Sequence, residues 1–133
     1  SPRIYFVSPE ELQFPIDKLK ELNSKRVVFT EHDNIEGVIS NIDVIFSFGL
    51  QRNDFRDVSE YNASIKRFSI NNNTLHGVKE NLAIFGELPN SLFSRDVDNG
   101  LDKSKHSQYY MQSLSSLYTW EALLGLSSGM VQK

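Results

Sequence analysis

Three short apolar runs, separated by helix-sized stretches, constrain the fold of this chain most strongly. The runs cover residues 4–7, 27–29 and 44–48, and each has the length of a strand. Between the first two runs, Pro15 opens a stretch whose apolar residues recur at helical spacing. A succession of strand, helix and strand favours a parallel sheet with right-handed crossovers. The sequence therefore predicts an α/β fold in which helices flank a parallel sheet.

The stretch before the third run predicts a second, shorter helix. Asp33 or Asn34 can cap it, and apolar residues follow at helical spacing over 35–42. The third run, 44–48, is continuously apolar, which is typical of a strand buried on both faces.

The second half of the chain has a looser pattern. Residues 58–69 favour a helix or turn with an aromatic edge, and 71–77 predict a short helix capped by asparagine. The last strand is predicted at 82–85, and 95–105 reads as a loop. A long helix is predicted over 107–126, with apolar residues around much of its surface.

Composition limits the partners that the chain can have. The 133 residues are 39% hydrophobic and 23% charged, which suits one domain over 1–133. A net charge of -3 without a basic stripe argues against nucleic acid. The chain has no cysteine, metal-ligand spacing, signal peptide or membrane span. We therefore expect no metal, no cofactor and no membrane partner, and a soluble intracellular protein of the cytoplasm or an organelle.

One segment carries a resemblance to a known family. Residues 43–60 read DVIFSFGLQRNDFRDVSE, a strand that runs into a polar loop. They resemble the aspartate carbamoyltransferase segment that binds the amino-acid substrate. Similar segments follow in register between Arg3 and Leu126: RIYFVSPEEL, YNASIKRFSINNNTLHGVKENLAIF and DKSKHSQYYMQSLSSLYTWEALLGL. The resemblance implies the C-terminal, aspartate-binding domain of the aspartate and ornithine carbamoyltransferase family, Rossmann-like and closed by a long helix.

The loops after residues 48 and 85 are where a ligand is expected, because open parallel sheets bind ligands beyond the carboxyl ends of their strands. The resemblance implies that Gln51 keeps the family's glutamine, which grips the substrate carboxylate. It also implies that Leu88 and Pro89 keep two residues of the family's His-Pro-Leu-Pro-Arg motif. These three are the predicted vestigial substrate-binding residues.

Four other positions depart from the family pattern. Gly49 stands where the family has Arg, and Gly86, Glu87 and Asn90 stand where it has His, the first Pro and Arg. The family's phosphate-binding Ser-Thr-Arg-Thr motif has no counterpart in the chain. Losing one donor that stabilises developing negative charge costs roughly a hundred- to a thousand-fold in rate. We therefore expect a degenerate site without catalytic residues.

The final helix predicts a covered surface. The resemblance implies that it packs on the family's N-terminal carbamoyl-phosphate domain, which is expected to be absent from this chain. An apolar patch left bare marks an interface. We expect that domain, a partner chain or a larger assembly to cover five residues: Tyr110, Leu114, Leu117, Trp120 and Leu124.

Three functions follow from these patterns. The favoured one is a carbamoyltransferase-like pseudoenzyme that serves as a structural or protein-interaction subunit. The alternative is an aspartate carbamoyltransferase subunit or fragment, acting on carbamoyl phosphate and aspartate, whose site is completed by residues outside this chain. The third is an amino-acid-binding sensor without turnover.

Overall fold

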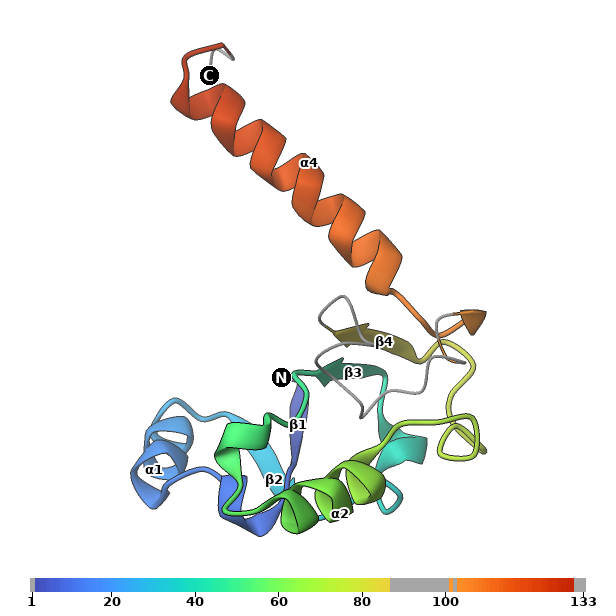
Figure 1. The fold of residues 1–133 in the computed structure, drawn as a ribbon. Helices are drawn as coiled ribbons and strands as arrows, with labels where there is room; N and C mark the ends of the chain where they lie inside the picture. Colours follow the sequence, from blue (N-terminus) through green and yellow to red (C-terminus); the bar gives the residue numbers. More distant parts are fainter. Residues whose placement is uncertain (1, 87–100, 102, 131–133) are drawn as a thin grey trace.

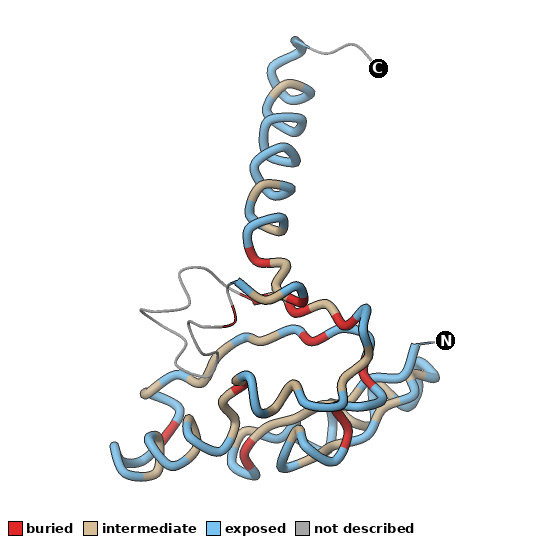
Figure 2. The backbone as a smooth tube through the Cα atoms, turned by 90° about the vertical axis from the view of Figure 1, so that its right-hand side faces the viewer, coloured by how far each residue is buried: buried red, intermediate tan, exposed pale blue. Residues whose placement is uncertain are grey.

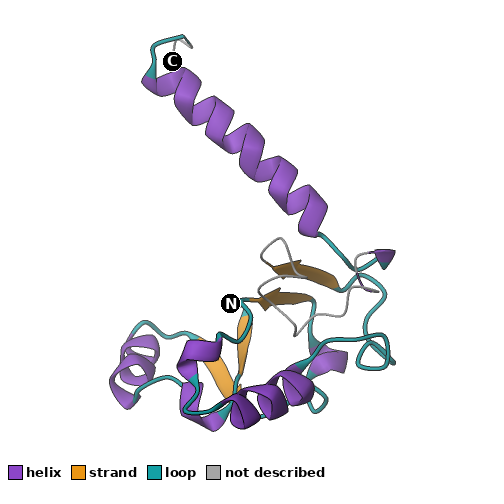
Figure 3. Cartoon of the chain, in the orientation of Figure 1, coloured by secondary structure: helices purple, strands orange, loops and turns teal. Residues whose placement is uncertain are grey.

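The computed structural model describes residues 2–86, 101 and 103–130 as an α/β body with a projecting helix (Figures 1 and 3). Its strands form two parallel pairs. In the first pair, β1 (Arg3–Val7) lies beside β2 (Val28–His32), with Arg3 opposite Val28. In the second, β3 (Val44–Ser47) lies beside β4 (Ala83–Gly86), with Val44 opposite Ala83. The predicted α/β class with parallel strands is confirmed.

Helices lie in the connections between consecutive strands. The connection from β1 to β2 holds η1 (Glu10–Leu12) and α1 (Ile16–Ser24), and the connection from β3 to β4 holds η3 (Arg52–Asp54) and α2 (Val58–Phe68). A third 3-10 helix, η2 (Ile39–Asn41), lies between the two pairs in the sequence. Pro15 is the N-cap residue of α1, as its fixed φ allows. Asp57 caps α2, because its carboxylate accepts a hydrogen bond from the Glu60 N–H at 2.8 Å.

The short helix predicted over 35–42 is confirmed only in part, as the 3-10 helix η2, and the helix predicted over 71–77 is wrong. The first stretch is a turn followed by η2, because Gly37 and the β-branched residues around it are poor helix formers. The second is a turn in which the Asn71 side chain accepts hydrogen bonds from the N–H groups of Asn73 and Thr74. Asparagine thus caps a turn there that does not propagate into a helix.

The prediction that the strand at 44–48 is buried on both faces is also wrong. Ile45 is buried, whereas Val44 is 54% and Phe46 is 53% exposed. Successive side chains of a strand point to opposite faces, so only one face of β3 reaches the core. On the other face Phe46 stacks on Phe85, with ring centroids 5.6 Å apart.

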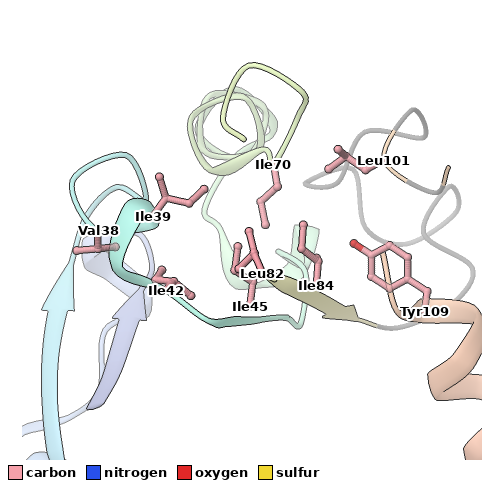
Figure 4. Packing of buried hydrophobic residues seen from close by; sticks show 9 residues of the cluster. All are labelled: Val38, Ile39, Ile42, Ile45, Ile70, Leu82, Ile84, Leu101 and Tyr109. Carbon is pink, nitrogen blue, oxygen red and sulfur yellow. The ribbon is translucent and has the colours of Figure 1, made fainter. Parts of the chain in front are cut away.

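The core lies on one face of the second strand pair. Figure 4 shows side chains from η2, β3 and β4 meeting Ile70, which follows α2. The buried cluster consists of Val38, Ile39, Ile42, Ile45, Ile70, Leu82, Ile84, Leu101 and Tyr109.

The last helix, α4 (Tyr109–Ser127), leaves this body (Figure 1). Only Tyr109, in its first turn, is buried, and most of the rest is exposed (Figure 2). Within the described residues, no helix is long and apolar enough to cross a membrane. The predicted long C-terminal helix is confirmed, and it carries its apolar residues away from the core.

Candidate functional site

Because β3 and β4 are parallel, their carboxyl ends lie at the same end of the second strand pair. Ser47 and Gly86, the last residues of these strands, lie opposite each other. The structure therefore brings Gly49 and Gln51 to the edge at which Gly86 ends its strand. Glu87, Leu88, Pro89 and Asn90 lie outside the described residues, so their expected roles stay predictions.

Gln51 lies on the surface at the start of η3. Its side chain is exposed, while its backbone carbonyl accepts a hydrogen bond from the Asp54 N–H at 3.1 Å. The neighbouring Arg52 donates from Nη1 to the Phe55 carbonyl at 2.8 Å. This guanidinium therefore holds the loop together, and the amide of Gln51 is the group beside it that faces solvent.

Gly49 has a backbone that suits glycine. Its φ is 72°, in the left-handed region. An L-residue there costs roughly 1–2 kcal/mol, which an arginine at this position would have to overcome.

Gly86 is fixed by packing. A Cβ at this position would lie 3.1 Å from Cε1 of Tyr109 and 3.2 Å from the Ser47 carbonyl oxygen. The start of α4 thus occupies the space that a side chain would need. Gly49 and Gly86 are therefore compatible with the local backbone and packing as they stand.

The segment before α4 is bonded to the outer edge of β4. Ile84 N–H donates to the His106 carbonyl at 2.8 Å, and Gln108 N–H donates to the Ile84 carbonyl at 2.9 Å. His106 is buried and donates from Nδ1 to the Leu82 carbonyl at 2.9 Å. The Gly86 N–H donates to Oε1 of Gln112 at 3.2 Å. Sequence reasoning missed the bonds of His106 and Gln112, since each joins residues far apart in the chain.

An apolar hollow of about 430 Å³ lies between the two strand pairs. Its lining includes Tyr5 and Val7 of β1, Val44 and Phe46 of β3, and Phe48 and Gly49 of the loop that follows. No group of three or more His, Asp or Glu side chains that could hold a metal ion occurs in the described ranges.

The predicted interface residues lie along α4. Tyr110 is 75%, Trp120 65% and Leu124 64% exposed. Leu117 is exposed as well, and Leu114 is half-buried. The structure thus leaves this apolar side of the helix largely uncovered by the described part of the chain.

Comparison with known proteins identifies the relatives of the chain. No protein-family model matches it. It is 32% identical to the aspartate carbamoyltransferase catalytic subunit of Methanococcoides burtonii over 129 residues, which are 97% of this chain and 41% of the relative. The catalytic subunit of Methanobrevibacter smithii is 31% identical, over 91% of this chain and 37% of that protein.

Solved structures agree with the sequence relatives. The catalytic subunit of M. jannaschii aspartate transcarbamoylase matches with a TM-score of 0.74 and 28% identity, over 84% of this chain and 36% of that one. The Trypanosoma cruzi aspartate transcarbamoylase in complex with N-(phosphonacetyl)-L-aspartic acid shares the fold, with a TM-score of 0.67 and 22% identity over 83% of this chain and 35% of that one. The chain spans about two fifths of the length of the curated relatives it matches. By sequence and by fold, it is a homologue of part of the aspartate carbamoyltransferase catalytic subunits.

Proposed function

We propose that this chain supplies the amino-acid side of an aspartate carbamoyltransferase site, which residues outside the chain complete. The observation that carries the proposal is the similarity to catalytic subunits over 97% of the chain. That similarity includes β3 and β4, whose carboxyl ends lie side by side. It favours the enzymatic alternative of the sequence analysis over loss of catalysis.

Carbamoyl transfer needs two sets of contacts, one to carbamoyl phosphate and one to the amino acid, and we divide them between this chain and the part that completes the site. Attack of an amine on carbamoyl phosphate develops negative charge on the carbonyl oxygen and releases phosphate, so donors and cations must surround that group. At the described edge, Arg52 is engaged with the Phe55 carbonyl. We assign the cations for phosphate to residues outside this chain, and to this chain the recognition of the amino acid.

Gln51 is the residue to which we assign carboxylate recognition. Its exposed side-chain amide lies on the loop that follows β3. An amide N–H can donate to a carboxylate oxygen, and a charge-assisted hydrogen bond of this kind is stronger than a neutral one. We assign the backbone around Leu88 and Pro89 to the amine of the substrate, as the resemblance implies.

The helix α4 joins this chain to the part that completes the site. Its side chains at 110, 117, 120 and 124 are more than half exposed. Covering each large apolar side chain stabilises the assembly by roughly 2 kcal/mol. We propose that the completing part, either in one polypeptide with this chain or as a partner chain, packs against this surface.

The proposal is tested by supplying the missing part. The chain is co-expressed with the portion of the Methanococcoides burtonii subunit that it does not match, and carbamoyl aspartate formation is measured. Gln51→Ala should lower kcat/KM for aspartate by about tenfold or more, because the interaction lost is a hydrogen bond to a charged group. The exposed neighbour Asn53 provides the control, since Asn53→Ala should change kcat/KM little.

A second candidate is the non-catalytic subunit. Two observations favour it: the left-handed backbone of Gly49 and the close approach of Tyr109 to Gly86. Both disfavour side chains where the family pattern has Arg and His. Under this candidate, the two parts assemble through α4 and no carbamoyl aspartate forms. Aspartate binding without turnover would instead support the amino-acid sensor.

A further inference from the structure

Arg52 differs from the other cationic side chains of the chain. It is half-buried, and its only partner within the described residues is a backbone carbonyl. Every other lysine or arginine in the described part of the chain either pairs with a carboxylate or is exposed. Withdrawing a cation from water without a counter-ion costs free energy, and an anion that binds to it reduces that cost. The burial of Arg52 therefore favours an anionic ligand.

The loop that follows β3 holds the Arg52 guanidinium in place. Its Nη1 donates to the Phe55 carbonyl at 2.8 Å. Phe55 is 6% exposed and its ring centroid lies 5.6 Å from that of Tyr61 in α2, so the residue that accepts this bond is anchored. A guanidinium has five N–H donors in a rigid fork, and within the described residues only Nη1 has a partner. Its Nε and Nη2 edge can therefore bind a carboxylate through two parallel hydrogen bonds.

The acidic side chains of the same loop do not neutralise Arg52. The Asp57 carboxylate accepts a hydrogen bond from the Glu60 N–H at 2.8 Å, and Oε2 of Glu60 accepts one from the Arg56 N–H at 3.2 Å. Both carboxylates are thus engaged with the backbone at the start of α2. Asp54 is exposed and forms no ion pair with Arg52 in the described structure. The positive charge of Arg52 is therefore available to an anion that binds beside Gln51.

We propose that Arg52 makes the site selective for an amino acid with two carboxylates. The inference rests on the proposed function, in which the Gln51 amide receives one carboxylate of the amino acid. Gln51 is neutral and Gly49 has no side chain, so Arg52 is the cation beside them. A hydrogen bond between a guanidinium and a carboxylate is charge-assisted and roughly twice as strong as a neutral one. The second carboxylate then pairs with Arg52, which supplies from a later position the charge that Gly49 lacks.

The experiment titrates three related compounds into the full, isotope-labelled chain and follows its NMR signals. Succinate has two carboxylates, succinamate has one and succinamide has none. Succinate should bind at least about tenfold more tightly than succinamate, because only succinate places a carboxylate on both side chains. The Nε–H signal of Arg52 should shift on addition of succinate and stay in place with succinamide. This second readout needs no variant of the chain.

Two variants that remove the same charge separate the role of Arg52 from a general effect of charge. Arg52→Gln should weaken succinate binding by about tenfold or more and bring it within about threefold of succinamate binding. Arg56→Gln is the matched control, because Arg56 is exposed and lies on the same loop. It should change both affinities by less than about twofold. A purely structural role of Arg52, through the Phe55 carbonyl, would instead weaken succinate and succinamate alike.

Three results would overturn the inference. The parent chain could bind succinate no more tightly than succinamate, or the Arg52 signal could stay in place when succinate is added. Arg52→Gln could also keep the same preference for succinate as Arg56→Gln. These measurements do not read carbamoyl transfer. The predicted preference without carbamoyl aspartate formation in the co-expressed complex would contradict the proposed function alone, and an active complex whose succinate preference survives Arg52→Gln would contradict this inference alone.

Discussion

Gly86→Ala should destabilise the chain, because one methyl group is forced into the junction of β3, β4 and α4. The new Cβ would lie 3.1 Å from Cε1 of Tyr109 and 3.2 Å from the Ser47 carbonyl oxygen. The first neighbour is a buried ring and the second is strand backbone, so neither can move away cheaply. Overpacking of this kind costs typically 1–3 kcal/mol. An unfolding entropy of about 0.28 kcal/mol/K for 133 residues converts this to a Tm lower by about 4–11 °C.

The stability of Gly86→Ala is measured by thermal and urea unfolding and compared with that of a matched glycine variant, Gly37→Ala. At Gly37 an added Cβ would meet only Oδ1 of Asn34, at an ordinary 3.7 Å. Gly37→Ala should therefore stay within about 0.5 kcal/mol of the parent or be slightly stabilising. Equal stability of the two variants would refute the reasoning that α4 fills the space beside Gly86. Gly86→His should be more damaging than Gly86→Ala, and so should not restore a working histidine.

Three further changes test other contacts. Asp57→Ala should cost about 1 kcal/mol in urea unfolding by removing the cap of α2, and an unchanged midpoint would refute that role. His106→Ala should cost roughly 1–3 kcal/mol, since it leaves the buried Leu82 carbonyl without its donor; the matched change is His76→Ala, whose effect should be within about 0.5 kcal/mol because that histidine is exposed. Trp120→Ala should weaken assembly with the completing part by about 2 kcal/mol or more in sedimentation, and leave the unfolding midpoint of the chain alone unchanged, because Trp120 is 65% exposed. If Trp120→Ala assembles as tightly as the parent, the proposal that the interface lies on α4 is contradicted.

Most of the elements could be predicted from local pattern. The strand at β1, the start of α1 at Pro15 and the helix α2 follow from apolar spacing and capping residues. The apolar spacing over 35–42 correctly indicated buried residues, but the stretch forms a turn and the 3-10 helix η2 in place of an α-helix, because spacing alone does not outweigh Gly37 and its β-branched neighbours. The exposure of Val44 and Phe46 could not be predicted either. An apolar run says that a strand has two apolar faces, but not whether both faces are covered within the described chain.

The sequence predicts where the site residues lie along the chain, but not which distant residues pack against them. The location of Gly49 and Gln51 beyond β3 follows from the strand that precedes them. The contact of Gly86 with Tyr109 and the bond of His106 to Leu82 do not, since each joins residues more than 20 positions apart. Such contacts depend on how the segment at 106–109 packs against β4, and a local sequence pattern does not contain that information.

The central claim, that this chain supplies the amino-acid side of a carbamoyltransferase site, is tested most directly by ligand binding to the assembled protein. N-(phosphonacetyl)-L-aspartic acid is suited to this, because it joins a phosphonate to aspartate and so reports on both sides of the site. It is titrated calorimetrically into the complex of this chain with the unmatched portion of the Methanococcoides burtonii subunit. We predict saturable binding that weakens about tenfold or more in Gln51→Ala and is unchanged in Asn53→Ala. A complex that forms but binds none of this compound, or binds it equally well with Gln51→Ala, would contradict the claim.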